Sequence, residues 1–410
     1  MTPDMETSHL LPEKPVLIGS GILVVLGIGA FALLLVAGQP QRAWQAYLIN
    51  FLFWSAISQG GLVFSAVMHL TRARWGGPLS GVAESFSAFF PVSFVLFLGL
   101  LLGGVHLFPW FGQDLHGKEV WLNLPFLFSR DGIGLILLYS LGAAYVYSAL
   151  GTKLMQATGG GEISKKFFGI LHWRSIDTVQ THKRMTVLAV LYILAFALVL
   201  SLIGYDLIMA MDPHWYSTLF GGYTFVKAFY IGLGGIIILA ATLQLRNADR
   251  ILFEKEQFLD IGRLFLAFCL VWADFFYCQL VVIWYGNIPE ETTYIVERVM
   301  RAPYNALAWF VFAISFILPF LVLLNRKIKT VPKAMTVLCI VVLIGIWLEH
   351  LLLLGPALIG HGEGLPLGIL DGVMALGFLG VMASALVLFL NQYPEIVTAA
   401  AKVMAEKETR

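Results

Sequence analysis

The sequence predicts an all-α integral membrane protein with about ten transmembrane helices, and three observations support this fold class. Apolar residues make up 59% of the 410 residues and charged residues only 12%, whereas a soluble domain carries roughly 25% charged residues. The mean hydropathy is +0.83, so the chain has too few charged side chains to cover a water-facing surface. Apolar runs of about 20 residues, the length that crosses a hydrocarbon core of about 30 Å, recur along the whole chain.

Each apolar run is predicted to form one helix, because a lipid-exposed segment must satisfy its own backbone hydrogen bonds. The first run, at 15–38, follows an acidic head, whereas a cleavable signal peptide has a basic head and a shorter apolar core. We therefore expect a retained helix there. The other runs, each long enough to span, lie at 45–69, 83–108, 132–150, 185–210, 221–244, 261–286, 303–325, 334–354 and 367–390.

The distribution of lysine and arginine predicts the orientation of the helices. One side of the ten-span arrangement collects 20 of the 26 basic residues, and the other side holds only Arg42, Lys118, Arg130, Arg298 and Arg301. Because loops rich in lysine and arginine stay in the cytoplasm, we expect both termini on the cytoplasmic side of the membrane. The net charge of +1 gives no indication of nucleic-acid binding, since the basic residues flank membrane spans.

Two features argue against cofactor sites within this chain. Cys269, Cys278 and Cys339 lie in apolar spans without CxxC or CxxCH spacing, so we expect no disulfide, zinc, covalent haem or iron–sulfur cluster. The longest loop, at 151–184, contains ATGGGEISKK but lacks the GK[ST] ending of a phosphate-binding loop. We expect a flexible cytoplasmic loop with an interfacial basic segment.

Two loops on the other side of the membrane are expected to be structured and to dock periplasmic partners. In MDPHWYSTLFGGY, Asp212 is expected to cap a helix that starts at Pro213. In YGNIPEETTYIVER, Pro289 is followed by two acids and predicts another helix start. The residues assigned to this periplasmic interface are Asp212, His214, Arg298 and Arg301.

Ionisable side chains inside the spans are the candidates for function, because they are costly to place in lipid. Asp206 and Lys227 lie at similar depth on consecutive spans, and we expect them to pair, as a structural bridge or as part of a proton relay. Asp274 falls near the centre of the seventh span and is expected to exchange protons or to stay protonated against a neighbour. Glu349 and His350 diverge by about 100° on the ninth span, so only one of them should face the interior.

Further polar residues extend this pattern toward both membrane surfaces. His69 and Glu84 flank a short loop that should bring them together, and His106 and Asp371 lie toward the outer surface with Arg298 and Arg301. These proton-path candidates outline two half-paths that meet near Asp274. Glu297 and Arg301 are also an i, i+4 pair, which is the simpler explanation for both. No histidine lies at the midplane, which disfavours haem ligation, and the aromatic stripe FSAFFPVSFVLF indicates a quinone pocket or, more commonly, packed phenylalanine.

Several motifs together resemble one known family. WQAYLINFLFWSAISQGGLVFSAVMHLTRARW, WLNLPFLF, YDLIMAMDPHWYSTLFGGYTF, WYGNIPEETTYIVER and RAPYNALAWF closely resemble the F-type membrane subunits (ActF) of alternative complex III. That complex is a bacterial quinol:electron-acceptor oxidoreductase, and its membrane subunits are related to the NrfD and polysulfide-reductase anchors. The resemblance runs from about residue 40 to 390.

The resemblance implies two four-helix bundles plus two flanking helices, with boundaries at 1–44, 45–210, 211–354 and 355–410. It implies a complex with a multihaem cytochrome c, an iron–sulfur protein and a sister NrfD-like subunit, and these partners would hold the haem c and the iron–sulfur clusters. For this chain itself, the resemblance implies no bound cofactor other than a possible quinol or quinone. Only Asp206, Asp212, His214 and Lys227 lie inside matching motifs.

The leading interpretation is therefore a structural anchor and proton-conducting subunit of a quinol-oxidising complex, without a redox centre or catalytic residue of its own. One alternative is a quinol-binding anchor, whose signature would be an acid beside an aromatic cleft open to lipid. The other is a secondary transporter, which should show helix breaks at matching places in two halves. Pro91 breaks the third span and has no clear counterpart in the seventh.

Overall fold

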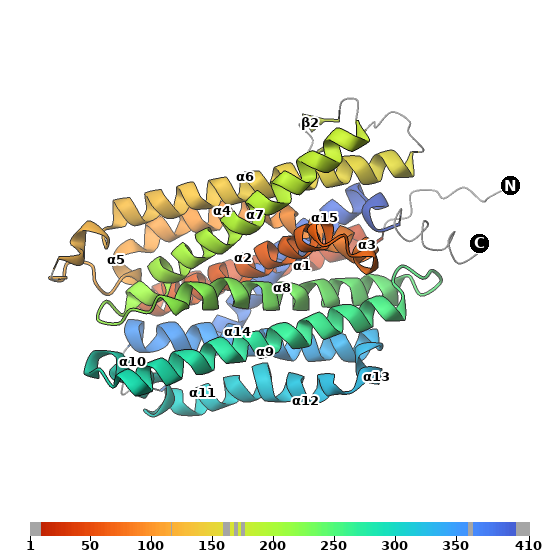
Figure 1. Ribbon diagram of the computed structural model, residues 1–410. Helices are drawn as coiled ribbons and strands as arrows, with labels where there is room; N and C mark the ends of the chain where they lie inside the picture. The colour runs from red at the N-terminus through yellow and green to blue at the C-terminus, as the bar shows by residue number, and fades with distance from the viewer. Residues whose placement is uncertain are drawn as a thin grey trace.

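The computed structural model describes residues 10–115, 117–158, 165–167, 171–173, 177–359 and 364–398. Within these residues ten helices are long and apolar enough to span a membrane, which confirms the predicted fold class and the predicted spans. The helices run side by side through one elongated bundle (Figure 1). We call the end at which α1 begins and α15 ends the terminal end, and the opposite end, which carries α10, the distal end.

The helices are joined mostly by short loops. Their bounds are α1 Glu13–Val36, α2 Pro40–Leu70, α3 Gly77–Ser85, α4 Phe90–Gly99, α5 Gly104–Leu107, α6 Leu124–Ala157, α7 Thr178–Leu207, α8 Leu219–Arg246, α9 Lys255–Gly286, α10 Pro289–Val299, α11 Tyr304–Phe312, α12 Leu318–Leu324, α13 Arg326–Lys329, α14 Pro332–Ile359 and α15 Ile369–Gln392. Short 3₁₀ turns lie at 74–76, 86–89, 100–103, 118–120 and 209–211. Several helices extend beyond the apolar runs that predicted them, because polar residues continue the helix outside the apolar core.

Capping side chains fix where three of these helices begin. Asn123 Oδ1 accepts a hydrogen bond from the Phe126 amide at 3.0 Å at the start of α6, and Asp177 does the same for Val179 before α7. Glu254 and Gln257 form a reciprocal capping box at the start of α9. Each cap satisfies amide groups that the first helical turn leaves without partners.

The two periplasmic loop predictions have different outcomes. Pro289 is the first residue of α10, as expected. The prediction that Asp212 caps a helix starting at Pro213 is wrong, because Asp212 follows the 3₁₀ turn Met209–Met211 and α8 begins only at Leu219. The carbonyl of Asp212 instead accepts a hydrogen bond from the Trp215 amide in a turn.

Two of the spans are interrupted. In the third span a 3₁₀ turn at Phe86–Phe89 precedes α4, which has Pro91 in its first turn, so the predicted break is present. In the eighth span a π-helical turn at Ala313–Ile317 separates α11 from α12. The seventh span, α9, runs without interruption, so the break at Pro91 has no counterpart in it.

The two central helices, α2 and α8, are the most deeply buried spans and cross each other very closely. A Cβ atom on Gly60 would overlap the carbonyl of Ala228, and a Cβ on Gly232 would overlap the backbone of Gly60 and Gly61. Only glycine permits this approach, which small residues commonly provide between membrane helices.

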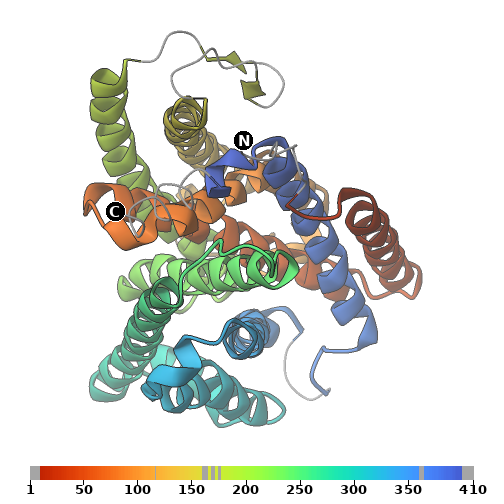
Figure 2. The same ribbon diagram turned by 90° about the vertical axis from the view of Figure 1, so that its right-hand side faces the viewer.

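The remaining helices form two sets around this crossing. In the first set α3, α4, α5 and α7 pack against α2, and α6 packs against α7. In the second set α9 and α14 pack against α8, α12 packs against α9, and α11 packs against α14. Both α2 and α8 start at the distal end. α1 and α15 pack on each other at the periphery, where Gly27 and Gly377 touch (Figure 2). The domain boundaries drawn from the sequence stay predictions.

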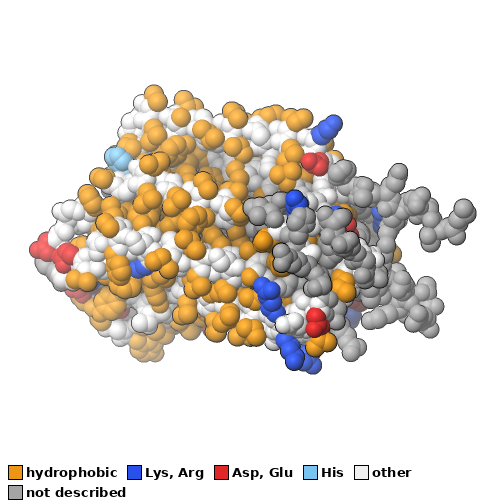
Figure 3. Space-filling model, turned by 90° about the horizontal axis from the view of Figure 1, so that it is seen from above, with side chains coloured by type: hydrophobic (Ala, Val, Ile, Leu, Met, Phe, Trp, Pro, Cys, Tyr) orange, Lys and Arg blue, Asp and Glu red, His pale blue; other side chains and the backbone are white. Residues whose placement is uncertain are grey.

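The face seen in Figure 3 is mostly apolar over its middle, and its charged side chains lie mainly toward the two ends. At the terminal end the described parts of the 151–184 loop include an antiparallel pair of two-residue strands, β1 Lys166–Phe167 and β2 Leu171–His172. Trp173 stacks on Tyr147 of α6 with ring centroids 5.2 Å apart. The loop expected to be flexible is therefore packed where it is described, and the glycines at 159–161 lie outside the described residues.

Candidate functional site

The most deeply buried ion pair joins the second set of helices at its centre. Lys227 on α8 and Glu349 on α14 are both about 2% exposed, and Lys227 Nζ lies 3.4 Å from Glu349 Oε1. The Tyr223 hydroxyl, one helical turn before Lys227, donates a hydrogen bond to the same carboxylate oxygen. Glu349 Oε2 is buried and has no hydrogen-bond partner among the described residues. We call Tyr223, Lys227 and Glu349 the central cluster.

His350 follows Glu349 but turns toward the other set of helices. Its Nδ1 atom donates to the carbonyl of Ile346 at 2.8 Å, so in the neutral ring Nε2 is the nitrogen that can accept a hydrogen bond. The ring is 2% exposed and lies edge-on to Phe53 of α2. The prediction that only one of Glu349 and His350 faces the interior is wrong, because α14 is enclosed by both sets of helices.

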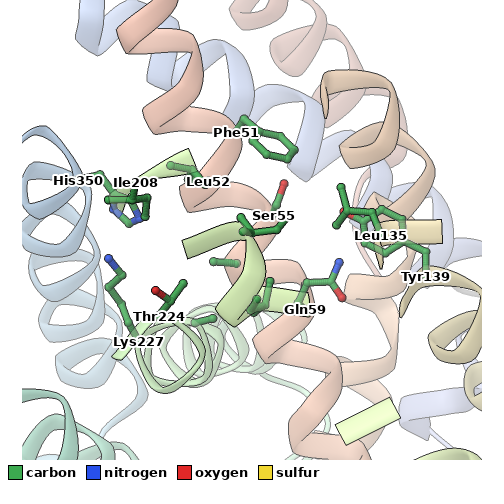
Figure 4. Close-up of a pocket in the computed structure, with 14 residues that line it drawn as sticks. Phe51, Leu52, Ser55, Gln59, Leu135, Tyr139, Ile208, Thr224, Lys227 and His350 are labelled. Carbon is green, nitrogen blue, oxygen red and sulfur yellow. The ribbon is translucent and has the colours of Figure 1, made fainter. Parts of the chain in front are cut away.

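A small cavity lies between His350 and Lys227 on one side and Gln59 and Tyr139 on the other (Figure 4). Its volume is about 30 Å³, and a water molecule needs about 10–15 Å³ of such space and two to four polar partners. Ser55 lies between the two sides. The cavity is therefore large enough for one or two bridging waters at the interface of α2 and α8.

Hydroxyl groups continue from the cavity into the first set of helices. Tyr139 and Ser93 lie within 2.7 Å, and Ser93 and Ser55 within 2.5 Å, so each can donate to the next. Tyr192 donates to the Gln59 side-chain oxygen at 3.0 Å. Every one of these side chains is buried, and the donor direction in each hydroxyl pair can reverse.

A second buried group of charges lies at the distal end, between α6 and α7. Arg130 makes a two-pronged contact with Asp206, with both N···O distances at 2.6 Å, and Trp121 Nε1 donates to the same carboxylate at 3.1 Å. Asp131 is fully buried beside them and interacts with both Asp206 and Arg130. Two carboxyls share one guanidinium, so a single bound proton makes the group electrically neutral.

A third group of charges lies near the terminal end. Glu84 on α3 is 1% exposed, and its Oε1 atom accepts from Lys153 Nζ at 2.7 Å and from Ser65 at 2.9 Å. Ser65 in turn lies 3.1 Å from the Tyr145 hydroxyl. His69, predicted to meet Glu84, instead contacts Thr186 at 3.1 Å and the ring of His182. That prediction is wrong because His69 points from α2 toward α7, whereas Glu84 points toward α6.

The predicted pairing of Asp206 with Lys227 is also wrong. Their spans are consecutive and the two residues have similar depth, but Asp206 faces α6 and pairs with Arg130, whereas Lys227 faces α14 and pairs with Glu349. Depth along a helix follows from hydropathy, but the direction in which a side chain points depends on which neighbours surround that helix.

Asp274 is not in the interior of the bundle. Its side chain lies on the outward face of α9, while its neighbours Trp272 and Ala273 face inward. Cys278 Sγ, 4.0 Å away, is its nearest polar contact among the described residues. The two half-paths therefore do not meet at Asp274, and the buried charges form separate groups, of which Lys227 and Glu349 are one.

The remaining predicted residues have structural roles or lie at the surface. Asp371 pairs with Arg42 at 2.5 Å and accepts from the Gly368 amide at the start of α15. Arg301 pairs with Glu297 as the i, i+4 spacing predicts. His106 and His214 are exposed at the distal end. These positions do not join the central cluster.

Arg298 is buried and holds α10 against α14. Its guanidinium donates to the carbonyl of Leu353 at 3.0 Å, lies 3.5 Å from the Tyr294 ring centroid and 3.8 Å from Asp212. Its side chain is therefore not on the docking surface where the sequence placed it. Burial raises the pKa of Tyr294 to about 12, although Arg298 beside it opposes the shift.

Several site residues were missed because their spans were predicted too short. The fourth span was placed at 132–150, but α6 runs from Leu124 to Ala157 and includes Arg130, Asp131 and Lys153. A hydropathy scan that tolerated one charged residue per helical turn would have included these three residues in the span. Gln59 and Tyr223 carry no charge, so nothing in the sequence distinguishes them from packed polar residues.

Comparisons with known proteins add no functional information to this geometry. No protein-family model matches the chain, and no curated protein matches it as a relative. Among the described residues, no three His, Cys, Asp or Glu side chains are grouped to hold a metal ion. The arrangement consists of three buried groups of charged side chains and, beside the central cluster, a row of buried hydroxyl groups.

Proposed function

We propose that the chain is a membrane anchor and proton-conducting subunit of a bacterial quinol:electron-acceptor oxidoreductase of the alternative complex III type. The observation that carries the proton-conducting role is the buried central cluster beside a water-sized cavity at the α2–α8 crossing. Charged groups in a membrane interior are costly and are typical of proton or ion pathways. The type of complex rests on the motifs that resemble ActF, and the redox centres would belong to the partner subunits.

The path begins at the terminal end with Lys153 and Glu84, and it continues through Ser65 and Tyr145. α2 then carries the path inward, since Ser65 and Gln59 are six residues, or about 9 Å, apart along the helix. Side-chain contacts do not bridge this interval among the described residues, so we place a short chain of transient waters there.

The path crosses from the first set of helices to the second at the cavity between Gln59 and Lys227. Lys227, Glu349 and Tyr223 can each bind or release a proton at this place. Glu349 interacts with Tyr294, which contacts Arg298, and Arg298 lies beside the partly exposed Asp212. This last group forms the exit at the distal end.

The orientation and location belong to the same proposal. The loops at the terminal end are rich in lysine and arginine, so both termini lie in the cytoplasm and the distal end faces the periplasm of a bacterial inner membrane. In a variant without its three native cysteines, His214→Cys should react with an impermeant maleimide in intact spheroplasts. Glu256→Cys should react only after permeabilisation, and the reverse pattern would invert the orientation.

The proton-conducting role is tested by measuring protons released per electron by the purified complex in liposomes. Glu349→Gln should reduce proton transfer beyond the scalar release about tenfold or more while quinol oxidation under uncoupled conditions continues. Asp260→Asn removes a partly exposed carboxylate that pairs with Arg263 on α9, and it is the matched control. Unchanged stoichiometry in Glu349→Gln would limit this cluster to a structural role.

A further inference from the structure

Two histidines from different helices meet at the terminal end of the molecule, and the proposed proton path uses neither of them. His69 lies in the last turn of α2, and His182 lies in the second turn of α7. Their ring centroids are 4.9 Å apart, and the ring planes are inclined by 58°. His69 is partly buried and His182 is exposed, so water and dissolved ions can reach the pair.

The arrangement of the two rings is compatible with binding to one metal ion. Zinc–nitrogen bonds of about 2.0–2.1 Å and a tetrahedral angle place the centroids of two imidazoles on the same ion about 5 Å apart. Two rings stacked face to face could not direct nitrogen atoms at a common point, and the inclination of 58° excludes such a stack.

A hydrogen bond determines which nitrogen of His69 is available to a metal. The Thr186 hydroxyl donates its only proton to the carbonyl of His182 at 3.1 Å. The oxygen of this hydroxyl therefore accepts a hydrogen bond from Nε2 of His69, also at 3.1 Å. A neutral imidazole has one N–H group, so Nδ1 of His69 carries the free lone pair. Histidines that bind metals are commonly held by such a hydrogen bond at the other ring nitrogen.

The composition of the pair indicates which class of ion it would bind. Neutral imidazole nitrogens suit zinc, copper and nickel, whereas magnesium and calcium require oxygen ligands. Lys183 and Arg184, which follow His182 and are exposed, further disfavour ions that are held by charge alone. Among the described residues no third histidine, cysteine or acid joins the pair, so water would complete the coordination shell.

We infer that His69 and His182 together bind a divalent transition metal ion of the zinc and copper class, and that the bound ion hinders proton uptake. The second part rests on the proposed function. The ring centroid of His69 lies 6.3 Å from that of Tyr145, whose hydroxyl lies 3.1 Å from Ser65 in the proposed path. A divalent cation beside these groups repels an arriving proton.

Metal binding is measured on the full chain in lipid nanodiscs, with Cu²⁺ as the probe. The chain is purified without a polyhistidine tag and treated with a chelator that is then removed. Electron spin-echo envelope modulation counts the imidazoles on the ion, and we expect two in the native chain and one in either His69→Gln or His182→Gln. Excess Zn²⁺ should displace the Cu²⁺. His214→Gln changes an exposed histidine at the distal end, so this matched control should retain two.

Thr186 distinguishes a built metal site from two adjacent surface histidines. Thr186→Val removes the acceptor at Nε2 of His69 and should weaken Zn²⁺ binding about tenfold or more, as loss of such an outer partner commonly does. Thr186→Ser keeps the hydroxyl group and should retain the native affinity. Both affinities are measured by competition with Cu²⁺, and an unchanged affinity in Thr186→Val would contradict the assignment of Nδ1 as the nitrogen that binds the metal.

The effect on proton uptake is measured with the purified complex in liposomes. Zn²⁺ should reduce proton transfer beyond the scalar release. The complex with His182→Gln should need at least tenfold more Zn²⁺ for the same reduction, because losing a ligand should cost no less than losing an outer partner. Equal sensitivity of the two complexes to Zn²⁺ would overturn the effect on proton uptake.

The results also separate the metal site from the proposed function. A single imidazole on Cu²⁺ in the native chain, or the same signal in the native chain and both histidine variants, would overturn the site. A native complex without proton transfer beyond the scalar release would overturn the proposed function and the effect of the metal on proton uptake. The count of imidazoles would still decide the metal site, because that measurement involves no proton transfer.

Discussion

Lys227 Nζ lies 3.4 Å from Glu349 Oε1 at a place where both side chains are about 2% exposed. Each charge is therefore neutralised by the other and not by water. A buried pair of this kind contributes little net stability, but a single remaining member is strongly destabilising because its charge has no partner.

Lys227→Met should therefore destabilise the protein by about 3–5 kcal/mol, and the double variant Lys227→Met/Glu349→Gln should recover most of that loss. Thermal unfolding of the four proteins of this double-mutant cycle measures the coupling. Additive effects of the two changes would mean that the side chains do not interact in the membrane-embedded protein.

The two carboxyls beside Arg130 should respond differently to substitution. Asp206 receives two short contacts from the guanidinium and one from Trp121, so Asp206→Asn should destabilise the chain by about 3–5 kcal/mol. Asp131→Asn removes a carboxyl whose oxygens have no hydrogen-bond partner among the described residues, and it should leave the melting temperature unchanged or raise it. Equal losses in both variants would contradict this division.

The crossing of α2 and α8 predicts a steric effect from a single methyl group. Gly232→Ala should lower the melting temperature, since the added Cβ meets the backbone of Gly60 and Gly61 and must push the helices apart. Gly21→Ala on the outer face of α1 is the matched control because its Cβ meets nothing within 4 Å. The same melting temperature in both alanine variants would argue against the close approach.

Tyr294 predicts a loss of stability at alkaline pH. The pKa of Tyr294 is about 12 in the folded chain, against a reference value of 10.0. The protonated phenol therefore makes its full contribution to the stability of the fold below pH 10, and this contribution disappears as the pH rises through 12. Two units correspond to up to about 3 kcal/mol. The difference in unfolding free energy between the native chain and Tyr294→Phe, followed from pH 8 to 12, should narrow over this window, and a constant difference would contradict the prediction.

The fold was predictable because length and hydropathy determine it: ten apolar runs can only be helices in lipid. The side-chain pairs were not predictable for a different reason. The partners of Asp206, Lys227, His69 and Glu84 differ from the predicted ones, because hydropathy does not specify which face of a span meets which neighbour. Asp274 shows the same limit, because a charge near the middle of a span can face either the interior or lipid.

Charged residues also make α6 longer than the span that the sequence predicts. Arg130 near its start pairs with Asp206 of α7, and Lys153 near its end pairs with Glu84 of α3, so paired charges extend a span that hydropathy alone truncates. Paired charges cost less than isolated ones in a membrane, and a scan of single positions cannot recognise the pairing.

Arg298 ties the extramembrane helix α10 to one particular turn of α14. Its guanidinium bonds the carbonyl of Leu353, which lies one helical turn after Glu349 and three residues before Pro356. Pro356 lacks the amide that would bond the carbonyl of Leu352, so the turn that contains Leu353 has one backbone hydrogen bond fewer, and the Arg298 contact from α10 braces it from outside. A subunit that tilts α10 on docking must break or stretch the hydrogen bonds between Arg298 and Leu353. The first part of α14 to be displaced would then be the turn that follows the buried acid Glu349.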